Sequence, residues 1–212
     1  MSGRTARFSP ILLAVALAGC GGGGGKPLVA PARVYFLRDG KVAAVARRLP
    51  LSEKALLGAL RDGPTADERR IGIAPGEGGA QVVYTLSQFD PAAPVTYRGK
   101  RYTRAGFEDR TPAILVESPL PFQTVHVPQL HAGGTANTFE ATFEYDLLGL
   151  GGKLLAHHFV TATSGNGQRG TFDFDVPFSV ERSEPGKLVV YERSAENGRR
   201  IHVVEIPLRL SP

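Results

Sequence analysis

The chain has 212 residues, a formal net charge of +5, 26 glycines, 16 prolines, one cysteine and no tryptophan. A chain of this length buries enough surface to fold without a disulfide or a structural metal, and a single cysteine excludes an internal disulfide framework. The abundant glycine and proline, together with many valine, phenylalanine and threonine residues, predict a strand-rich protein with many turns.

The first 20 residues have the pattern of a secretion signal. Arg4 and Arg7 make a positive segment, and the apolar run at 11–18 is too short to span a bilayer as a helix. Small residues precede Cys20 and five glycines follow it, so no core sequence surrounds the thiol. This arrangement resembles the lipobox of bacterial lipoproteins, in which cleavage leaves an N-terminal cysteine that carries lipid. We expect residues 1–19 to be a signal peptide and Cys20 to be the lipid attachment site.

The residues after the signal predict a tether rather than a ligand loop. Residues 20–32 combine the cysteine with a Gly-rich coil, which is flexible. Lys26 is followed by Pro27 instead of Ser or Thr, so the glycines do not match a phosphate-binding loop. No later stretch approaches about 20 apolar residues. We therefore expect a protein anchored by lipid to the extracytoplasmic face of the bacterial cell membrane.

Charge is divided unequally along the chain. Residues 26–112 contain 15 basic and 9 acidic residues, which gives +6, whereas residues 113–212 contain 8 basic and 11 acidic residues, which gives −3. The basic half is either an ordinary solvated surface or a surface attracted to anionic lipid or wall polymer beside the anchor. Nucleic acid is not expected as a partner, because secretion separates the protein from it.

Residues 33–112 are predicted to form a small α+β domain. Residues 34–37 and 42–45 predict two strands joined by a tight turn at Asp39-Gly40. Ser52 is a suitable N-cap for a short helix with leucines along one face. The remaining expected elements are a turn of helix at 66–70, a helix over 81–89, and a hairpin made by 95–97 and 101–102.

The motifs of this segment resemble the GerM-type sporulation and spore-germination domain. They are Val34-Tyr35-Phe36, Asp39-Gly40, Ala59-Leu60, Gly63-Pro64-Thr65 and Gln81-Val82-Val83-Tyr84-Thr85-Leu86. Members of that family carry additional strands between the last two motifs, where this chain has only residues 66–80. The resemblance therefore implies a shortened form of the domain.

Period-two alternation predicts a β-sandwich over residues 113–212. Phe139, Ala141, Phe143 and Tyr145 are expected on one face of a strand. Residues 154–161 are apolar on both faces, which predicts a central strand. The other expected strands are 114–117, 124–130, 172–176, 188–191 and 202–210. About seven strands in roughly 100 residues fit an immunoglobulin-like sandwich, here without the cysteine pair and tryptophan of antibodies.

This half of the chain resembles the immunoglobulin-like domain associated with bacterial spore germination. The matching motifs are Ile114-Leu115-Val116-Glu117-Ser118-Pro119, Phe139-Glu140-Ala141, Gly170-Thr171-Phe172, Phe178, Val190-Tyr191-Glu192, Ser194, Asn197 and Gly198. The resemblance implies an extracytoplasmic lipoprotein with a role in envelope assembly or protein contact, and it carries over no established chemistry.

Side chains with metal-binding or catalytic chemistry are scattered. His157 and His158 are neighbours on a strand, so they point to opposite faces. Asp173 and Asp175 share a face, which suits either calcium or, more simply, a solvated surface. The serines lack the Gly-x-Ser-x-Gly elbow, and no cofactor fingerprint is present. We expect no catalytic residue, no metal and no cofactor.

The sequence is compatible with three functions. The first is a non-enzymatic binding or assembly module that contacts membrane lipid through Cys20 and an envelope protein or wall polymer. The second is an envelope enzyme whose site combines dispersed residues, such as Glu144, His158, Asp173 and Asp175. The third is a carrier that holds a ligand between the two sheets of the sandwich. The first is preferred, because no motif supports chemistry.

Overall fold

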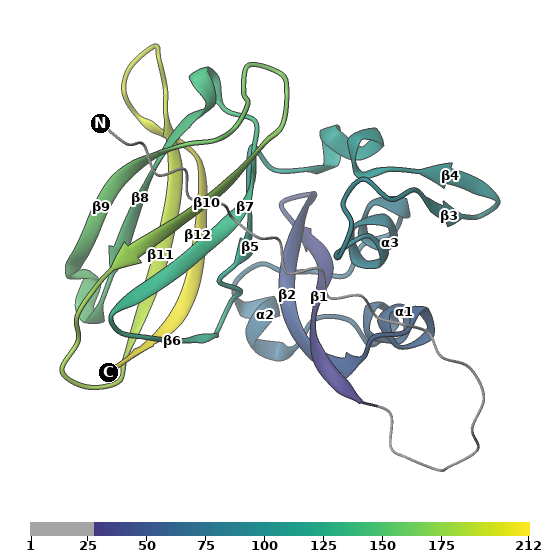
Figure 1. Ribbon diagram of the computed structural model, residues 1–212, viewed down its shortest axis with the longest axis horizontal. Coiled ribbons are helices and arrows are strands. Elements are labelled where there is room, and N and C mark those ends of the chain that lie inside the picture. The colour runs from purple at the N-terminus through teal and green to yellow at the C-terminus, as the bar shows by residue number, and fades with distance from the viewer. Residues whose placement is uncertain (1–27) are drawn as a thin grey trace, which may run out of the picture.

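The computed structural model describes residues 28–212, in which a small α+β part stands beside a β-sandwich (Figure 1). The predicted signal peptide, Cys20 and most of the tether lie outside the described residues. The fold is mainly β, as expected, and within the described residues the α-helices are confined to the first half. Within the described residues, no helix is long and apolar enough to cross a membrane.

The α+β part begins with a long hairpin of β1 (Val29–Arg38) and β2 (Lys41–Pro50), paired antiparallel along their whole length. Asp39 and Gly40 form the turn with φ values of 52° and 75°, which is the left-handed conformation that a two-residue turn needs. The predicted hairpin is confirmed, and each strand is longer than predicted.

Two helices, α1 (Glu53–Asp62) and α3 (Gly79–Leu86), pack against this hairpin. A third, α2 (Ala66–Arg70), is joined to it by the ion pair of Arg47 with Glu68. The first, α1, begins at Ser52, whose hydroxyl accepts a hydrogen bond from the Ala55 amide as predicted. A capping box starts α2: Thr65 and Glu68 bind each other's backbone amides. The helix α3 is shorter than predicted. Phe89 therefore lies beyond the helix and is exposed, instead of on its apolar face.

Replacing Gly58 by Ala is expected to raise the free energy of unfolding by about 0.5–1 kcal/mol. Gly58 lies inside α1, and a Cβ there would meet nothing within 4 Å, so Ala restricts the unfolded chain without a clash. The same change at Gly63, which ends the helix with a φ of 80°, should destabilise the protein. Urea denaturation of both variants measures the difference. A destabilised Gly58→Ala protein would contradict the position of Gly58 inside α1, with free space around it.

The α+β part ends with a short hairpin and a 3₁₀ segment. The hairpin consists of β3 (Val95–Tyr97) and β4 (Lys100–Tyr102), as predicted, and is followed by η1 (Arg104–Arg110). Residues 71–78 add only an isolated bridge, between Leu37 and Ala74, to the first hairpin. Within the described residues, this part therefore has two separate two-stranded sheets, β1-β2 and β3-β4.

The sandwich contains a three-stranded and a five-stranded sheet. The order in the first is β10-β7-β5, and in the second β6-β12-β11-β8-β9. The strands are β5 (Ile114–Ser118), β6 (Thr124–His126), β7 (Gln129–Ala136), β8 (Thr142–Leu148), β9 (Leu154–Thr161), β10 (Gly170–Pro177), β11 (Glu184–Arg193) and β12 (Arg200–Ser211). Two short 3₁₀ turns flank β8, namely η2 (Phe139–Ala141) and η3 (Leu150–Gly152).

Two predicted strands have different limits in the structure. The alternation assigned to 139–145 starts only at Thr142, because Glu140 and Ala141 have φ values of 53° and 57° and turn the chain. Phe139 is consequently exposed. The single strand predicted over 124–130 is two strands in different sheets, and Pro128, which has no amide to donate, lies between them.

The prediction of a central strand at 154–161 is wrong. This segment forms β9 at the edge of the five-stranded sheet, paired only with β8. Its Leu154 and Phe159 side chains are 56% and 61% exposed. Apolar residues on both faces therefore do not indicate burial here, because the outer face of this edge strand is uncovered.

The space between the two sheets is filled by the main core. Phe143 of β8 meets the rings of Phe172 and Phe174 of β10 edge to face, and Tyr145 stacks on Phe174, with ring centroids 4.9–6.4 Å apart. Such aromatic contacts add to the burial of apolar area. A carrier that holds its ligand between the sheets would have to displace these rings.

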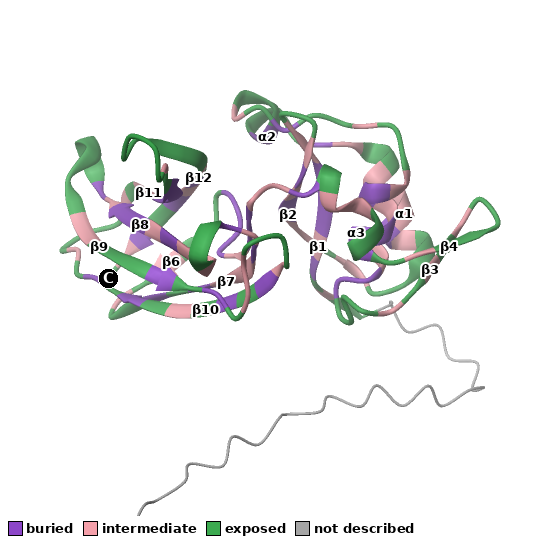
Figure 2. Cartoon of the chain, turned by 90° about the horizontal axis from the view of Figure 1, so that it is seen from above, coloured by how far each residue is buried: buried purple, intermediate pink, exposed green. Residues whose placement is uncertain are grey.

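Strand β5 joins the sandwich to the α+β part, and buried residues continue across this junction (Figure 2). Ile114 and Val116 belong to the sandwich core. Leu115, between them, packs with Tyr35 and Tyr84 of the preceding part. The division of the chain at residue 112 remains a prediction, whereas the shared packing of side chains from both parts is visible in the structure.

Candidate functional site between the hairpin and the sandwich

A cavity of about 500 Å³ lies between the β1–β2 hairpin and the sandwich. Its size is within the range of small-molecule sites. The hairpin supplies residues 38–44 apart from Gly40, β5 and its approach supply residues 111–116, and β12 supplies residues 202–206 apart from Glu205. Glu108, Asn137 and Arg169 complete the polar part of the lining. The cavity therefore exists only because β5 and β12 are held against the hairpin.

One ion pair fixes the polar end of this cavity. Arg169 binds Glu108 in two-pronged fashion, with both nitrogen–oxygen distances at 2.9 Å, and Asn137 donates to the same carboxylate at 2.9 Å. These hydrogen bonds, those from Arg169 first, hold the pKa of Glu108 below its ordinary value. Glu108 is therefore ionised, and both of its carboxylate oxygens already accept hydrogen bonds.

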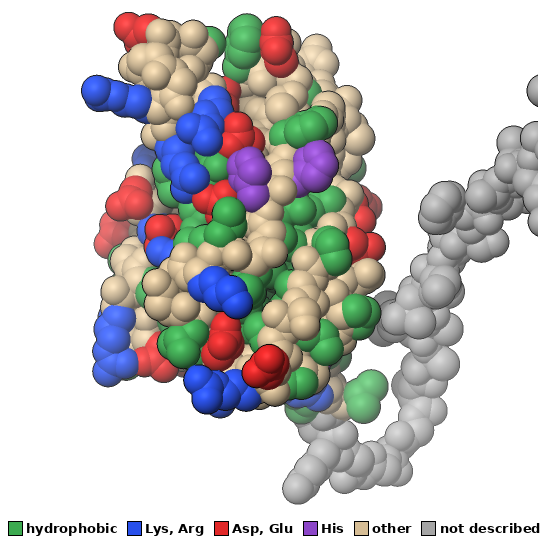
Figure 3. Space-filling model, turned by 90° about the vertical axis from the view of Figure 1, so that its left-hand side faces the viewer, with side chains coloured by type: hydrophobic (Ala, Val, Ile, Leu, Met, Phe, Trp, Pro, Cys, Tyr) green, Lys and Arg blue, Asp and Glu red, His purple; other side chains and the backbone are tan. Residues whose placement is uncertain are grey.

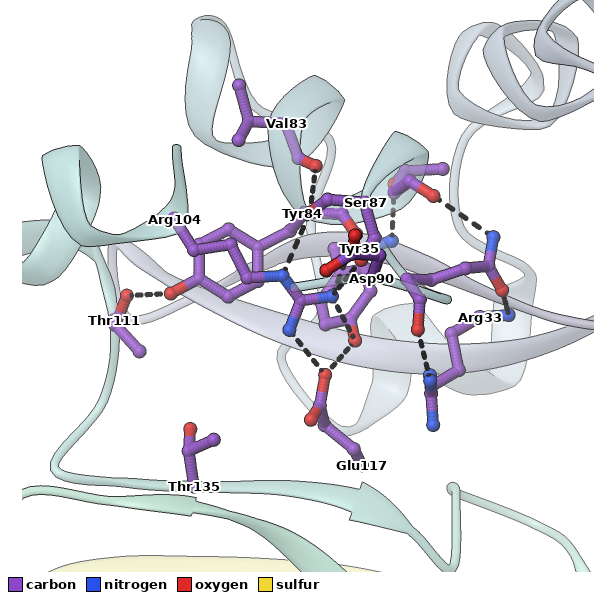
Figure 4. A network of polar contacts seen from close by, with 12 residues as sticks. Arg33, Tyr35, Val83, Tyr84, Ser87, Asp90, Arg104, Thr111, Glu117 and Thr135 are labelled. Atoms are coloured by element: carbon purple, nitrogen blue, oxygen red, sulfur yellow. Dashed lines mark hydrogen bonds and ion pairs between the residues drawn. The ribbon is translucent and has the colours of Figure 1, made fainter. Parts of the chain in front are cut away.

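A buried polar network holds the end of β5 against β1 and α3 (Figure 4). The guanidinium of Arg104 donates to Glu117 at 2.8 Å and to the Ser87 hydroxyl at 3.0 Å. The Tyr35 hydroxyl donates to the same Glu117 oxygen. Arg104 also lies over the Tyr84 ring, 4.5 Å from its centroid. The network thus connects three elements through one arginine and one carboxylate.

The protonation states of the side chains in this network suit a structural role rather than a catalytic one. Burial raises the pKa of Tyr35 well above its usual value, and the nearby Glu117 carboxylate raises it further. Tyr35 therefore stays a neutral hydrogen-bond donor. The Ser87 hydroxyl donates to the Val83 carbonyl at 2.7 Å, so its proton has no basic acceptor. The arrangement suits a structural contact that holds the α+β part and the sandwich together.

A second polar cluster covers the outer face of the five-stranded sheet. The Tyr191 hydroxyl donates to Glu144 at 2.8 Å, and Arg193 donates to the same carboxylate at 3.1 Å. Arg200 pairs with Asp146 at 2.7 Å and lies over the Tyr191 ring. The hydrogen bonds from Arg193, followed by that from Tyr191, lower the pKa of Glu144. Burial, followed by the bond to Glu144, raises the pKa of Tyr191 to about 12.

The structure separates the residues considered for an enzyme site. His157, not His158, joins the outer-face cluster, with its Nδ1 2.8 Å from Asp146. His158 instead lies on the other face of β9 and accepts from the Phe159 amide. Figure 3 shows this side of the sandwich, where histidines lie beside acidic and basic side chains. Glu144 and His158 therefore do not form a pair.

Asp173 and Asp175 lie on the other sheet, on the outer face of β10. Both are exposed, as the simpler interpretation predicted, and both contact His131 of β7, at 3.2 and 3.1 Å. Across residues 28–212, no three or more His, Cys, Asp and Glu side chains are placed to hold a metal ion. The two aspartates face away from Glu144, since they project from the opposite surface of the sandwich.

Sequence reasoning missed the network residues and the cavity. Arg104 and Glu117 belong to a segment without a chemical motif, and their pairing depends on how β5 meets η1. A partial signal was present, because Glu117 directly follows the continuously buried run of residues 114–116. A carboxylate in that place requires a cationic partner.

Comparison with known proteins gives a family match for one part of the chain. No curated protein matches it. A solved structure of WR4, a C. elegans MSP family member, aligns over 47% of this chain and 97% of its own at 14% identity, with a TM-score of 0.26, which supports no conclusion. Residues 113–199 match the Gmad2 family model, the immunoglobulin-like domain of bacterial spore germination. This match confirms the resemblance found in the sequence and supports a spore germination-type immunoglobulin-like domain over residues 113–199.

Proposed function

We propose that the protein is a lipid-anchored, extracytoplasmic lipoprotein that acts as a non-enzymatic binding or assembly module of the cell envelope. The observation that carries the proposal is the match of residues 113–199 to a spore germination-associated immunoglobulin-like domain. The leader and Cys20 support anchoring at the outer side of the cell membrane. The motifs of residues 33–112 support a shortened GerM-like domain between anchor and sandwich.

The ion pairing of the carboxylates at these sites supports a binding role. Glu108 is bound by Arg169, Glu117 by Arg104, and Glu144 by Arg193, so each carboxylate already has a fixed cationic partner. A general base needs a carboxylate or imidazole that is free to accept a proton from substrate. These ion pairs instead stabilise the junction between the hairpin and the sandwich, and the outer face of the five-stranded sheet.

Replacing Cys20 by Ser is expected to abolish labelling by radioactive palmitate and to move the protein from the membrane to the soluble fraction. Stable anchoring needs acyl chains on that thiol, since each buried methylene contributes about 0.8 kcal/mol. The measurement is labelling and fractionation of cells that express each variant. Gly22→Ala, in the same tether, is the matched control and should keep both properties. Labelling of Cys20→Ser, or unlabelled wild-type protein in the cytosol, would refute anchoring at this residue.

Contact with an envelope component is tested separately. A photo-crosslinking amino acid at Phe159, which is exposed on the edge strand β9, should give a discrete adduct in native membranes. The same amino acid at Phe89, exposed in the α+β part, is the matched position. Equal adducts from both positions, or none from Phe159, would contradict a binding role for this edge of the sandwich.

A further inference from the structure

The lining of the cavity beside the hairpin combines an apolar wall with two cations of the hairpin, Arg38 and Lys41. Most of its lining is aliphatic. The strands β2, β5 and β12 supply most of these apolar residues, namely Val42, Ala43, Ala44, Ile114, Leu115, Val116, Val203, Val204 and Ile206. Val203 remains 46% exposed although it lies on a strand of the sandwich. Binding of an apolar chain to an aliphatic wall of this kind is favourable, because it removes apolar surface from water.

Two cations stand together where the hairpin meets the cavity. Arg38 and Lys41 are directly opposite each other in the β1–β2 register and both line the cavity. Like charges in directly opposite positions repel each other. The exposed Asp39 lies in the turn between them. An anionic group bound by both cations would remove this repulsion.

The partners of these cations in residues 28–212 are backbone carbonyls. Arg38 donates to the Glu205 carbonyl at 3.2 and 3.3 Å, and Lys41 donates to the Asp109 carbonyl at 2.5 Å. Neither forms an ion pair within 4.0 Å among the described residues, and the Glu205 carboxylate is bound by Lys187 at 3.0 Å. Burial lowers the pKa of Arg38, although the nearby carboxylates of Asp39 and Glu205 oppose this effect. The guanidinium is thus partly desolvated, and among residues 28–212 no carboxylate oxygen lies within 4.0 Å of it.

We propose that this cavity binds a single-chain anionic amphiphile, with its anionic group between Arg38 and Lys41 and its apolar chain along the wall formed by β2, β5 and β12. The volume of about 500 Å³ accommodates a small head and a short chain. A cationic head would meet Arg38 and Lys41 and be repelled. This binding goes beyond the proposed anchoring and does not depend on Cys20.

The first test compares defined probes by calorimetric titration of the full-length protein, each below its micelle-forming concentration. Decyl phosphate is expected to bind saturably at one site. Octyl phosphate should bind more weakly, by roughly fourfold for each methylene that is no longer buried. Inorganic phosphate, which has the head without the chain, and decyltrimethylammonium, which has the chain with the opposite charge, should both bind at least about tenfold more weakly. A site that takes free phosphate as well as decyl phosphate would overturn the amphiphile assignment.

The second test uses matched variants. Arg38→Gln should weaken decyl phosphate binding about tenfold or more, because a charge-assisted pair of hydrogen bonds is lost. Arg48→Gln, exposed at the other end of β2, should bind as wild type. Val203→Glu should also weaken binding relative to Val203→Gln, which has the same size without the charge.

The Val203 pair keeps the proposal testable if Arg38→Gln fails to fold. Thermal melting identifies such a failure, and the comparison of Glu with Gln at the half-exposed Val203 then decides. Wild-type affinity in both Arg38→Gln and Val203→Glu, or equal binding of decyltrimethylammonium, would overturn the proposal. The absence of saturable decyl phosphate binding by the folded wild-type protein would do so as well.

Discussion

Replacing Glu117 by Leu is expected to lower the free energy of unfolding by about 3–5 kcal/mol, because it leaves a buried arginine without its carboxylate. The side chains of Arg104 and Glu117 are only 9% and 12% exposed, so water cannot replace the lost partner. The Tyr35 hydroxyl loses its acceptor in the same change. Chemical denaturation, followed by circular dichroism, measures the effect.

Two controls separate the loss of a buried partner from the loss of an ion pair as such. The double change Arg104→Met with Glu117→Leu should recover much of the stability, because no unpaired charge remains. Asp67→Ala breaks the exposed pair with Arg70, 75% and 64% exposed, and should cost less than about 1 kcal/mol. If Glu117→Leu is as mild as Asp67→Ala, the network does not hold the two parts together.

Replacing Gly134 by Ala is expected to destabilise the protein by about 3 kcal/mol, at the upper end of the usual cost of overpacking. Gly134 lies in β7, the middle strand of the three-stranded sheet. A Cβ there would overlap the carbonyl oxygen of Leu115 and come within 2.8 Å of the Phe172 ring. Since the first obstacle is backbone of the neighbouring strand, β5 itself would have to move.

Denaturant unfolding tests this expectation, with Gly106→Ala as the matched control. A Cβ at Gly106 meets nothing within 4 Å, so that variant should remain within about 0.5 kcal/mol of wild type. Because β5 also carries Leu115 into the contact with Tyr35, Gly134→Ala should affect the hairpin junction as well as the sandwich. A variant as stable as wild type would show that β5 and β7 are not so closely paired.

Local signals in the sequence predicted individual elements in both halves of the fold. Asp39-Gly40 predicted the hairpin turn, because few residue pairs adopt two successive left-handed conformations. Ser52 predicted the start of α1, because its hydroxyl satisfies a free amide within the same turn of helix. Alternation over residues 139–145 and 172–176 predicted two strands of a sandwich, since period two follows from the strand itself. The structure has these strands at Thr142–Leu148 and Gly170–Pro177.

Only the tertiary structure decided which strands are central and which are edges. The segment 154–161 has the composition of an interior strand, yet it lies at the edge of its sheet. The strand β7 was missed beyond Leu130 because Gly133 and Gly134 have low strand propensity; the close approach of β5 requires the absence of a side chain at Gly134. Sheet order depends on contacts between distant segments, which no local pattern encodes.

The sequence by itself predicted a secretion and lipidation signal, and it determined the mainly β class and the immunoglobulin-like character of residues 113–199. The junction network and the cavity came only from the tertiary structure. Tyr35, Arg104 and Glu117 are separated by up to 82 residues and have no shared motif. They meet because Leu115 is buried on the hairpin side of β5 while its neighbours are buried in the sandwich, and that division of one strand between two cores exists only after folding.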